Sequence, residues 1–189
     1  MRNALLAGLA VVGLALATPP AAEAFPIAAA GSEGFNIVVA TDGEVFARYE
    51  GTSASYTDML WLEGPTVIAD IFNNQATPVG TEVSLGSFAA GTVLRFSIHV
   101  INTGNIFYTG PGELNADGVA HARVQANWEP GRSLVSFEDL LNGPFDYNDL
   151  SFSFTNTIGV DSTAVPEPLG LSLLGLGLLG LGAARRKRG

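Results

Sequence analysis

Short runs in which apolar and polar residues alternate recur through the middle of the chain. In an extended strand, such alternation places the apolar side chains on one face and the polar ones on the other. The run at residues 93–100 is the clearest, because Leu94, Phe96, Ile98 and Val100 share one face. Similar runs lie at residues 35–40, 44–50, 120–128 and 150–155. Each run predicts a strand with one buried face.

The segments between these runs are rich in turn residues, and no run before the C-terminal tail carries a helical period. Asp42-Gly43 separates two runs and predicts a hairpin between them. We therefore expect an all-β domain at residues 25–159, with seven to nine antiparallel strands in two packed sheets. The expected architecture is a β-sandwich of jelly-roll-like type.

Aromatic residues admit two interpretations in such a domain. Trp61 and Trp128 fall on the apolar faces of their runs, which predicts core packing. A row of exposed aromatic side chains would instead indicate a carbohydrate-binding module. The candidates for that row are Tyr56, Trp61, Phe107, Tyr108 and Trp128, of which Phe107 and Tyr108 lie in an expected loop.

The first 24 residues have the composition of a secretory signal peptide. Arg2 supplies the positive start, residues 4–17 are apolar, and Ala22 and Ala24 form an A-x-A cleavage site. The protein is therefore expected to leave the cytoplasm.

A second apolar run, residues 169–184, lies near the C-terminus. As a helix it would extend about 24 Å, slightly less than the roughly 30 Å of a bilayer core. A basic cluster follows it directly, and positive residues favour the cytoplasmic side. The cluster consists of Arg185, Arg186, Lys187 and Arg188. We expect a transmembrane helix at 169–184, a basic cytoplasmic tail at 185–189, and a linker at 160–168.

The region between the two apolar ends is strongly acidic. Residues 25–164 carry 16 acidic side chains against four arginines, a net charge of −12. Such a domain does not bind nucleic acid by neutralising phosphates, whereas it attracts divalent cations. The chain has no cysteine, so disulfides and thiolate chemistry are excluded.

Val165, Pro166, Glu167 and Pro168 precede the apolar run and the basic cluster. This order resembles a PEP-CTERM sorting signal. The resemblance implies a Gram-negative bacterium that makes extracellular polysaccharide, and a membrane-embedded exosortase that cuts the inner-membrane-anchored precursor near the motif. The product then belongs to the cell surface or the extracellular (biofilm) matrix. The alternative is an ordinary single-span anchor that is never cut.

The body resembles a recurrent domain of unknown function in exported bacterial proteins with this tail. Members often read G-G-D-x-D before an aromatic residue and Asn-Asp, whereas residues 142–146 here read N-G-P-F-D, so the first aspartate is missing. The residues that carry the resemblance are 107–111, 115–118, 121–122, 137–140 and 146–150.

A group of oxygen-bearing side chains precedes the expected strand at residues 150–155. Calcium binds six to eight oxygens from carboxylates, amides and backbone carbonyls. Asp146 and Asn148 project to one side of an extended segment and Asp149 to the other, so a shared ion needs a turn at Asn148. Two interpretations stay open. In the first, a calcium ion holds the last hairpin together. In the second, the side chains only hydrogen-bond to the backbone of the turn and bind no ligand. The candidate ligands are Glu138, Asp139, Asp146, Asn148 and Asp149.

No catalytic motif stands out. His99 and His121 are the only histidines, and G-x-S-x-G is absent. We therefore expect a non-enzymatic surface or matrix protein with a structural or adhesive role, stabilised by calcium in the first interpretation. One alternative is an exopolysaccharide-binding module. Another is a glycan-active enzyme, which needs two carboxylates across a cleft.

Overall fold

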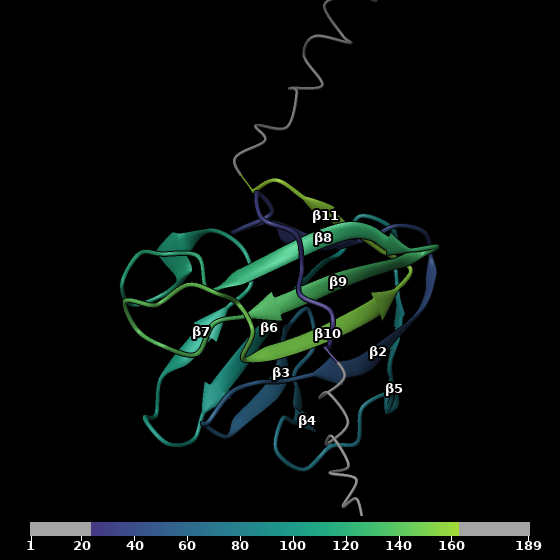
Figure 1. The fold of residues 1–189 in the computed structure, drawn as a ribbon. Helices are drawn as coiled ribbons and strands as arrows, with labels where there is room; N and C mark the ends of the chain where they lie inside the picture. The colour runs from purple at the N-terminus through teal and green to yellow at the C-terminus, as the bar shows by residue number, and fades with distance from the viewer. Residues whose placement is uncertain (1–23, 163–189) are drawn as a thin grey trace, which may run out of the picture.

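The computed structural model describes residues 24–162 of the 189-residue chain. These residues form an all-β domain with two antiparallel sheets and one short 3-10 turn (Figure 1). One sheet has the order β11-β1-β6-β3-β4, with β7 also pairing with β6, and the other has the order β5-β2-β10-β9-β8. The elements are β1 (Asn36–Val39), β2 (Gly43–Gly51), β3 (Asp58–Gly64), β4 (Ile68–Asn73), β5 (Glu82–Phe88), β6 (Val93–Val100), β7 (Ile106–Tyr108), η1 (Gly112–Leu114), β8 (Ala122–Glu129), β9 (Arg132–Phe137), β10 (Leu150–Thr155) and β11 (Thr157–Val160).

Inward side chains from both sheets form one hydrophobic cluster, as the alternating runs predict. Leu94, Phe96 and Ile98 of β6 have no exposed surface. The ring of Phe96 stacks on Phe154 of β10, with 4.3 Å between the ring centroids. Each large apolar side chain buried in this way contributes roughly 1.5–3 kcal/mol, so the core stabilises the fold without disulfides.

The prediction of a hairpin at Asp42-Gly43 is wrong. β1 pairs with β11 and β6, whereas β2 pairs with β5 and β10, so the turn carries the chain from one sheet to the other. Asp42 Oδ1 accepts a hydrogen bond from the Ala90 amide at 2.8 Å and holds the corner against a neighbouring loop. Turn residues favour a change of direction, but they do not determine which strand the next run pairs with.

The prediction that Trp61 and Trp128 pack in the core is also wrong. Leu60 and Leu62 enter the core, so Trp61 lies on the outer face of β3 and is partly exposed. β8 has a register shift between Gln125 and Glu129 that ends the predicted alternation. The indole of Trp128 lies 5.8 Å from the Arg48 guanidinium, partly exposed.

The N-terminal segment crosses the outer face of the five-stranded sheet, as the purple coil of Figure 1 shows in front of β9 and β10. The Ala28 amide donates to Ser136 Oγ of β9 at 2.8 Å. Phe25 packs against Gly51, where a Cβ would lie 2.5 Å from the phenylalanine Cβ. This segment buries part of a sheet face that would otherwise be open to solvent.

The expected signal peptide and transmembrane segment, with the sorting motif and basic tail, lie outside the described residues apart from Ala24. Within residues 24–162, the search for a helix with the length and hydropathy of a membrane span finds none. β11 ends at Val160, one residue beyond the expected domain boundary.

Candidate functional site

Five acidic residues meet where strands of both sheets end, and we call this group the acid end. Glu138 and Asp139 directly follow β9, Asp149 directly precedes β10, and Asp146 lies in the loop between them. Asp58 is the first residue of β3, in the other sheet. Sequence reasoning predicted the first four as ligands and missed Asp58.

The loop between β9 and β10 brings three of these acids to one point. Glu138, Asp146 and Asp149 each offer a carboxylate oxygen, and the three oxygens lie within 4.8 Å of one another. The turn that allows this is at Tyr147, whose φ is +56°, and not at Asn148 as expected. Asn148 instead donates its amide hydrogen to Asp146 Oδ2 at 2.7 Å.

The carboxylate of Glu138 organises the loop from inside. It is fully buried and accepts hydrogen bonds from the amides of Leu140 at 3.1 Å and Asp146 at 3.2 Å. The loop is therefore folded around a buried acid, and it positions Asp146 beside that acid.

Asp58 and Asp139 leave two buried oxygens without a donor. The Asp139 amide donates to Asp149 Oδ2 at 2.8 Å, and Asn74 Nδ2 donates to Asp58 Oδ2 at 3.0 Å. Within residues 24–162, no N–H or hydroxyl group donates to Asp139 Oδ2 or Asp58 Oδ1. The two carboxyl groups can hydrogen-bond to each other when one of them is protonated. Among the described residues, the only other buried side-chain nitrogen or oxygen atom without a donor or acceptor partner is Trp61 Nε1. Unpaired polar atoms therefore concentrate at the acid end.

Burial and mutual repulsion make these carboxyls weak acids. Burial, followed by the charges of Asp139 and Asp149, raises the pKa of Asp58 to about 8. The pKa of Glu138 is raised to about 8 and that of Asp139 to about 6, again by burial first and by Asp149 second. No ion pair found among residues 24–162 involves any of the five acids. The group therefore needs protons or a cation to offset its charge.

Solvent reaches the group through a surface cavity of about 290 Å³. Asp139 and Asp149 form part of its wall, so a small ion can approach these two acids from outside. The remaining lining residues are Ser53, Ser55, Tyr56 and Leu140.

His121 supports the loop from behind and does not face solvent. It is fully buried, although the alternation of its run places it outward. Its Nδ1 lies 3.0 Å from the Glu138 carbonyl oxygen, and its Nε2 lies 3.0 Å from Asp117 Oδ2. The ring stacks on Phe107 with 3.8 Å between centroids. Phe107 is buried too, so it does not form the ligand edge that its loop position suggested.

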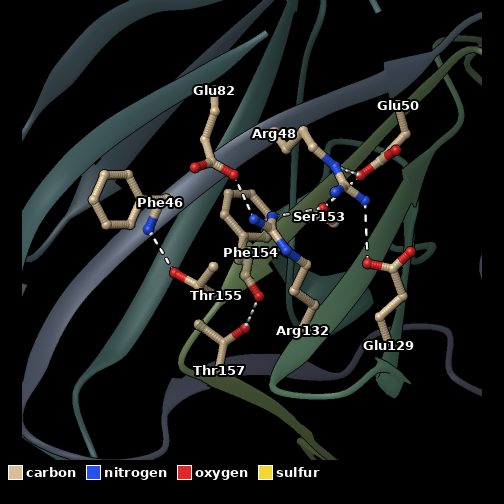
Figure 2. A network of polar contacts seen from close by, with 10 residues as sticks. All are labelled: Phe46, Arg48, Glu50, Glu82, Glu129, Arg132, Ser153, Phe154, Thr155 and Thr157. Atoms are coloured by element: carbon tan, nitrogen blue, oxygen red, sulfur yellow. Dashed lines mark hydrogen bonds and ion pairs between the residues drawn. The ribbon is translucent and has the colours of Figure 1, made fainter. Parts of the chain in front are cut away.

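Three other acids of the five-stranded sheet, Glu50, Glu82 and Glu129, have arginine partners, and Figure 2 shows this group, which we call the arginine face. Arg48 Nε lies 2.6 Å from Glu50 Oε1 and its NH2 group lies 3.2 Å from Glu129. Arg132 pairs with Glu82 and donates to Ser153 Oγ at 3.1 Å. Carboxylates here are neutralised by the protein itself.

Comparison of the chain with protein-family models, with curated proteins and with solved structures gives no match. The function is therefore inferred from the geometry of the site. Closely spaced hard oxygen donors without a cation of their own are suited to binding a divalent metal ion.

Proposed function

We propose that the chain is an exported protein of the cell surface or extracellular matrix, with a structural or adhesive role. Its domain is a jelly-roll-like β-sandwich, and a calcium ion bound at the acid end stabilises it. The protein acts without catalysis in this proposal.

One observation carries the calcium site: oxygens of Glu138, Asp146 and Asp149 converge within 4.8 Å. The orphaned Asp139 Oδ2 beside them supports the same interpretation, because a buried carboxylate oxygen without a donor destabilises the fold unless a proton or a cation approaches it. Asp58 contributes negative charge from the second sheet. A bound cation therefore attracts both sheets at this end.

Calcium fits this donor set better than other common ions. All donors are oxygens, which disfavours ions that prefer nitrogen or sulfur. The carboxylates come from different positions of an irregular loop. Calcium tolerates irregular coordination geometry, whereas magnesium requires a near-ideal octahedron.

Three features of the sequence support export and sorting. Ala22 and Ala24 form the signal cleavage site, Val165 to Pro168 form the sorting motif, and residues 185–188 supply the basic stop. Proline disfavours a helix at its own position and at the residue before it, so the sequence around Pro166 and Pro168 predicts a junction that an exosortase-type protease can reach at the membrane face.

The calcium proposal is tested by thermal unfolding of the purified full chain in mild detergent. The protein is measured in EDTA and then with millimolar Ca²⁺ or Mg²⁺. Calcium at about 100 times its dissociation constant adds about 2.7 kcal/mol to the free energy of unfolding, or several degrees in the melting temperature.

Variants assign that shift to the acid end. Asp146 is exposed, so Asp146→Ala is expected to fold and to lose most of the calcium shift. Glu113→Gln changes an exposed acid without a hydrogen-bond or ion-pair partner in the described chain and should retain the shift. A melting temperature that calcium leaves unchanged, or a shift that survives Asp146→Ala, would contradict the proposed site.

The sorting proposal is tested by changing Pro166 and Glu167 to alanine in a Gram-negative host that contains an exosortase. The unchanged chain is expected to lose its tail and leave the inner membrane, and the variant to accumulate there as the precursor. Immunoblots of membrane and extracellular fractions measure both. An unchanged chain that keeps its tail supports the uncut anchor instead.

A further inference from the structure

The outward face of β3, β6 and β7 carries a second cavity, of about 390 Å³. Glu63, Arg95, Tyr108 and Leu114 line it, and we call it the outer pocket. It combines an acid, a guanidinium and a phenol ring, which are the groups that orient a polar ligand in a small-molecule site.

Arg95 is the one arginine in residues 24–162 without an acidic partner. Arg48, Arg123 and Arg132 each form an ion pair with a glutamate. Arg95 is exposed on β6 and lines the pocket together with Glu63, but the two are not ion-paired. In a domain with 16 acids, its guanidinium remains available to a ligand.

Glu63 is held in place by its neighbours and still has acceptor capacity. Its Oε1 accepts from Ser97 Oγ at 2.7 Å and lies 3.2 Å from His99 Nε2. These contacts, the Ser97 bond foremost, lower the pKa of Glu63, so the group is ionised at neutral pH. No group within residues 24–162 donates a hydrogen bond to its Oε2.

Trp61 fixes this arrangement from the side. Its indole stacks on the His99 imidazole with 4.3 Å between centroids and 7° between the ring planes. The stack limits the rotation of His99, which in turn orients Glu63. Trp61, although it points outward, therefore helps to position the side chains that line the pocket.

We propose that the outer pocket binds an uncharged sugar unit of a polysaccharide. Hydroxyl groups of a pyranose donate to Glu63 Oε2 and accept from Arg95, and the Tyr108 ring lies beside the apolar face of the sugar. The pocket charges balance, and the net charge of −12 over residues 25–164 repels anionic polymers. Both features favour a neutral glycan over a uronic-acid polymer.

This proposal is independent of the calcium site, because none of the acid-end residues lines the outer pocket. The two proposals can therefore fail separately, and binding is measured in EDTA as well as in calcium.

The test is affinity electrophoresis of the full chain in gels that contain a neutral polysaccharide. The panel consists of a β-glucan, a galactomannan, dextran and, as the anionic member, polygalacturonate. We expect retardation by at least one neutral polymer, equal in EDTA and in calcium. Loss of a hydrogen bond to a charged group weakens affinity roughly ten- to hundredfold, so Arg95→Ala and Glu63→Gln should each reduce retardation to that extent.

Glu44→Gln is the matched control, since Glu44 is exposed on β2 in the other sheet. It should bind as the unchanged chain does, and equal melting temperatures establish that the pocket variants are folded. Absence of retardation by every neutral polymer overturns the proposal, and so does retardation that both pocket variants retain. Binding to polygalacturonate alone, in calcium alone, would overturn it as well and would assign glycan contact to the acid end.

Discussion

The acid end and the arginine face both gather carboxylates around the five-stranded sheet, and they differ in what faces those carboxylates. At the arginine face, Glu50 is nearly buried but has Arg48 at 2.6 Å and Ser153 Oγ at 2.5 Å. At the acid end, Glu138 is fully buried and receives only backbone amides. One region is complete within the described chain, whereas the other depends on protons or metal ions from the solvent.

Burial of an acid therefore does not by itself mark a binding site. Burial with an arginine indicates a structural network. Burial among other acids, with donorless oxygens, indicates a place where something positive binds. The comparison predicts opposite responses of the two regions to pH and to charge removal.

The largest expected effect is a pH dependence without divalent metal. The folded pKa values of Asp58, Glu138 and Asp139 are raised to about 6–8. Between about pH 5 and pH 8 the folded state therefore binds more protons than the unfolded state, so stability is highest on the acid side and falls as pH rises. Each proton of difference changes stability by about 1.4 kcal/mol per pH unit. Urea unfolding in EDTA at pH 5.5 and 8 should show a loss of about 3 kcal/mol for each extra proton that the folded state keeps across this range.

Saturating calcium is the control for this trend, because the ion replaces the protons at high pH. The loss should shrink to a small fraction of its size in EDTA. Stability that rises from pH 5.5 to 8 in EDTA would contradict the proposed electrostatics of the acid end.

A smaller loss is expected at the arginine face. Arg48→Met removes the partner of Glu50, whose carboxylate then keeps only Ser153 as a side-chain donor. An uncompensated, nearly buried charge destabilises the fold, here by about 2 kcal/mol. Urea unfolding measures the loss, and adding Glu50→Gln should recover part of it. A double variant no more stable than Arg48→Met would remove the charge explanation.

Removing a charge at the acid end should have the opposite sign. Asp58→Asn eliminates one repelling carboxylate and supplies an amide beside the acceptor Asp139. We expect a gain of about 1 kcal/mol at pH 8 in EDTA, measured by urea unfolding. The gain should vanish at pH 5, where the Asp58 carboxyl is already protonated. Destabilisation by Asp58→Asn at pH 8 would show that the Asp58 carboxylate stabilises the fold, and would contradict the repulsion inferred here.

The smallest effect is expected for Arg95→Ala. Arg95 is exposed and forms no ion pair in residues 24–162. Its loss should change the free energy of unfolding by less than about 0.5 kcal/mol. A thermal scan measures this, and a larger loss would mean that Arg95 belongs to the scaffold and is not reserved for a ligand.

Sequence alternation predicted the core of β6 and β10 well, because Leu94, Phe96 and Phe154 repeat with the period of a strand. It failed at Trp61, since Leu60 and Leu62 set the phase of β3 and an apolar residue on the other phase lies outside. Local patterns also cannot say which sheet receives the strand after Asp42-Gly43.

The acidic loop could be predicted because its acids lie close together in the sequence. Asp58 is distant in sequence and joins them only because the fold brings the start of β3 close to Asp139 and Asp149. A signal was nevertheless present, because Asp58 has the inward phase of Leu60 and Leu62. A charged residue at an inward strand position indicates a buried polar group that needs a partner.

The pairing of β11 with β1 has a mechanical consequence. Asn36 lies opposite Val160, so the end of β11 that leads to the C-terminal tail lies beside the start of β1. β11 is an edge strand, and its only partner in the sheet is β1. If the proposed C-terminal anchor holds the protein, tension on that end of the chain would therefore open this pair one hydrogen bond at a time from Val160. An edge strand that peels in this way would yield at low force and absorb extension before the load reaches the core.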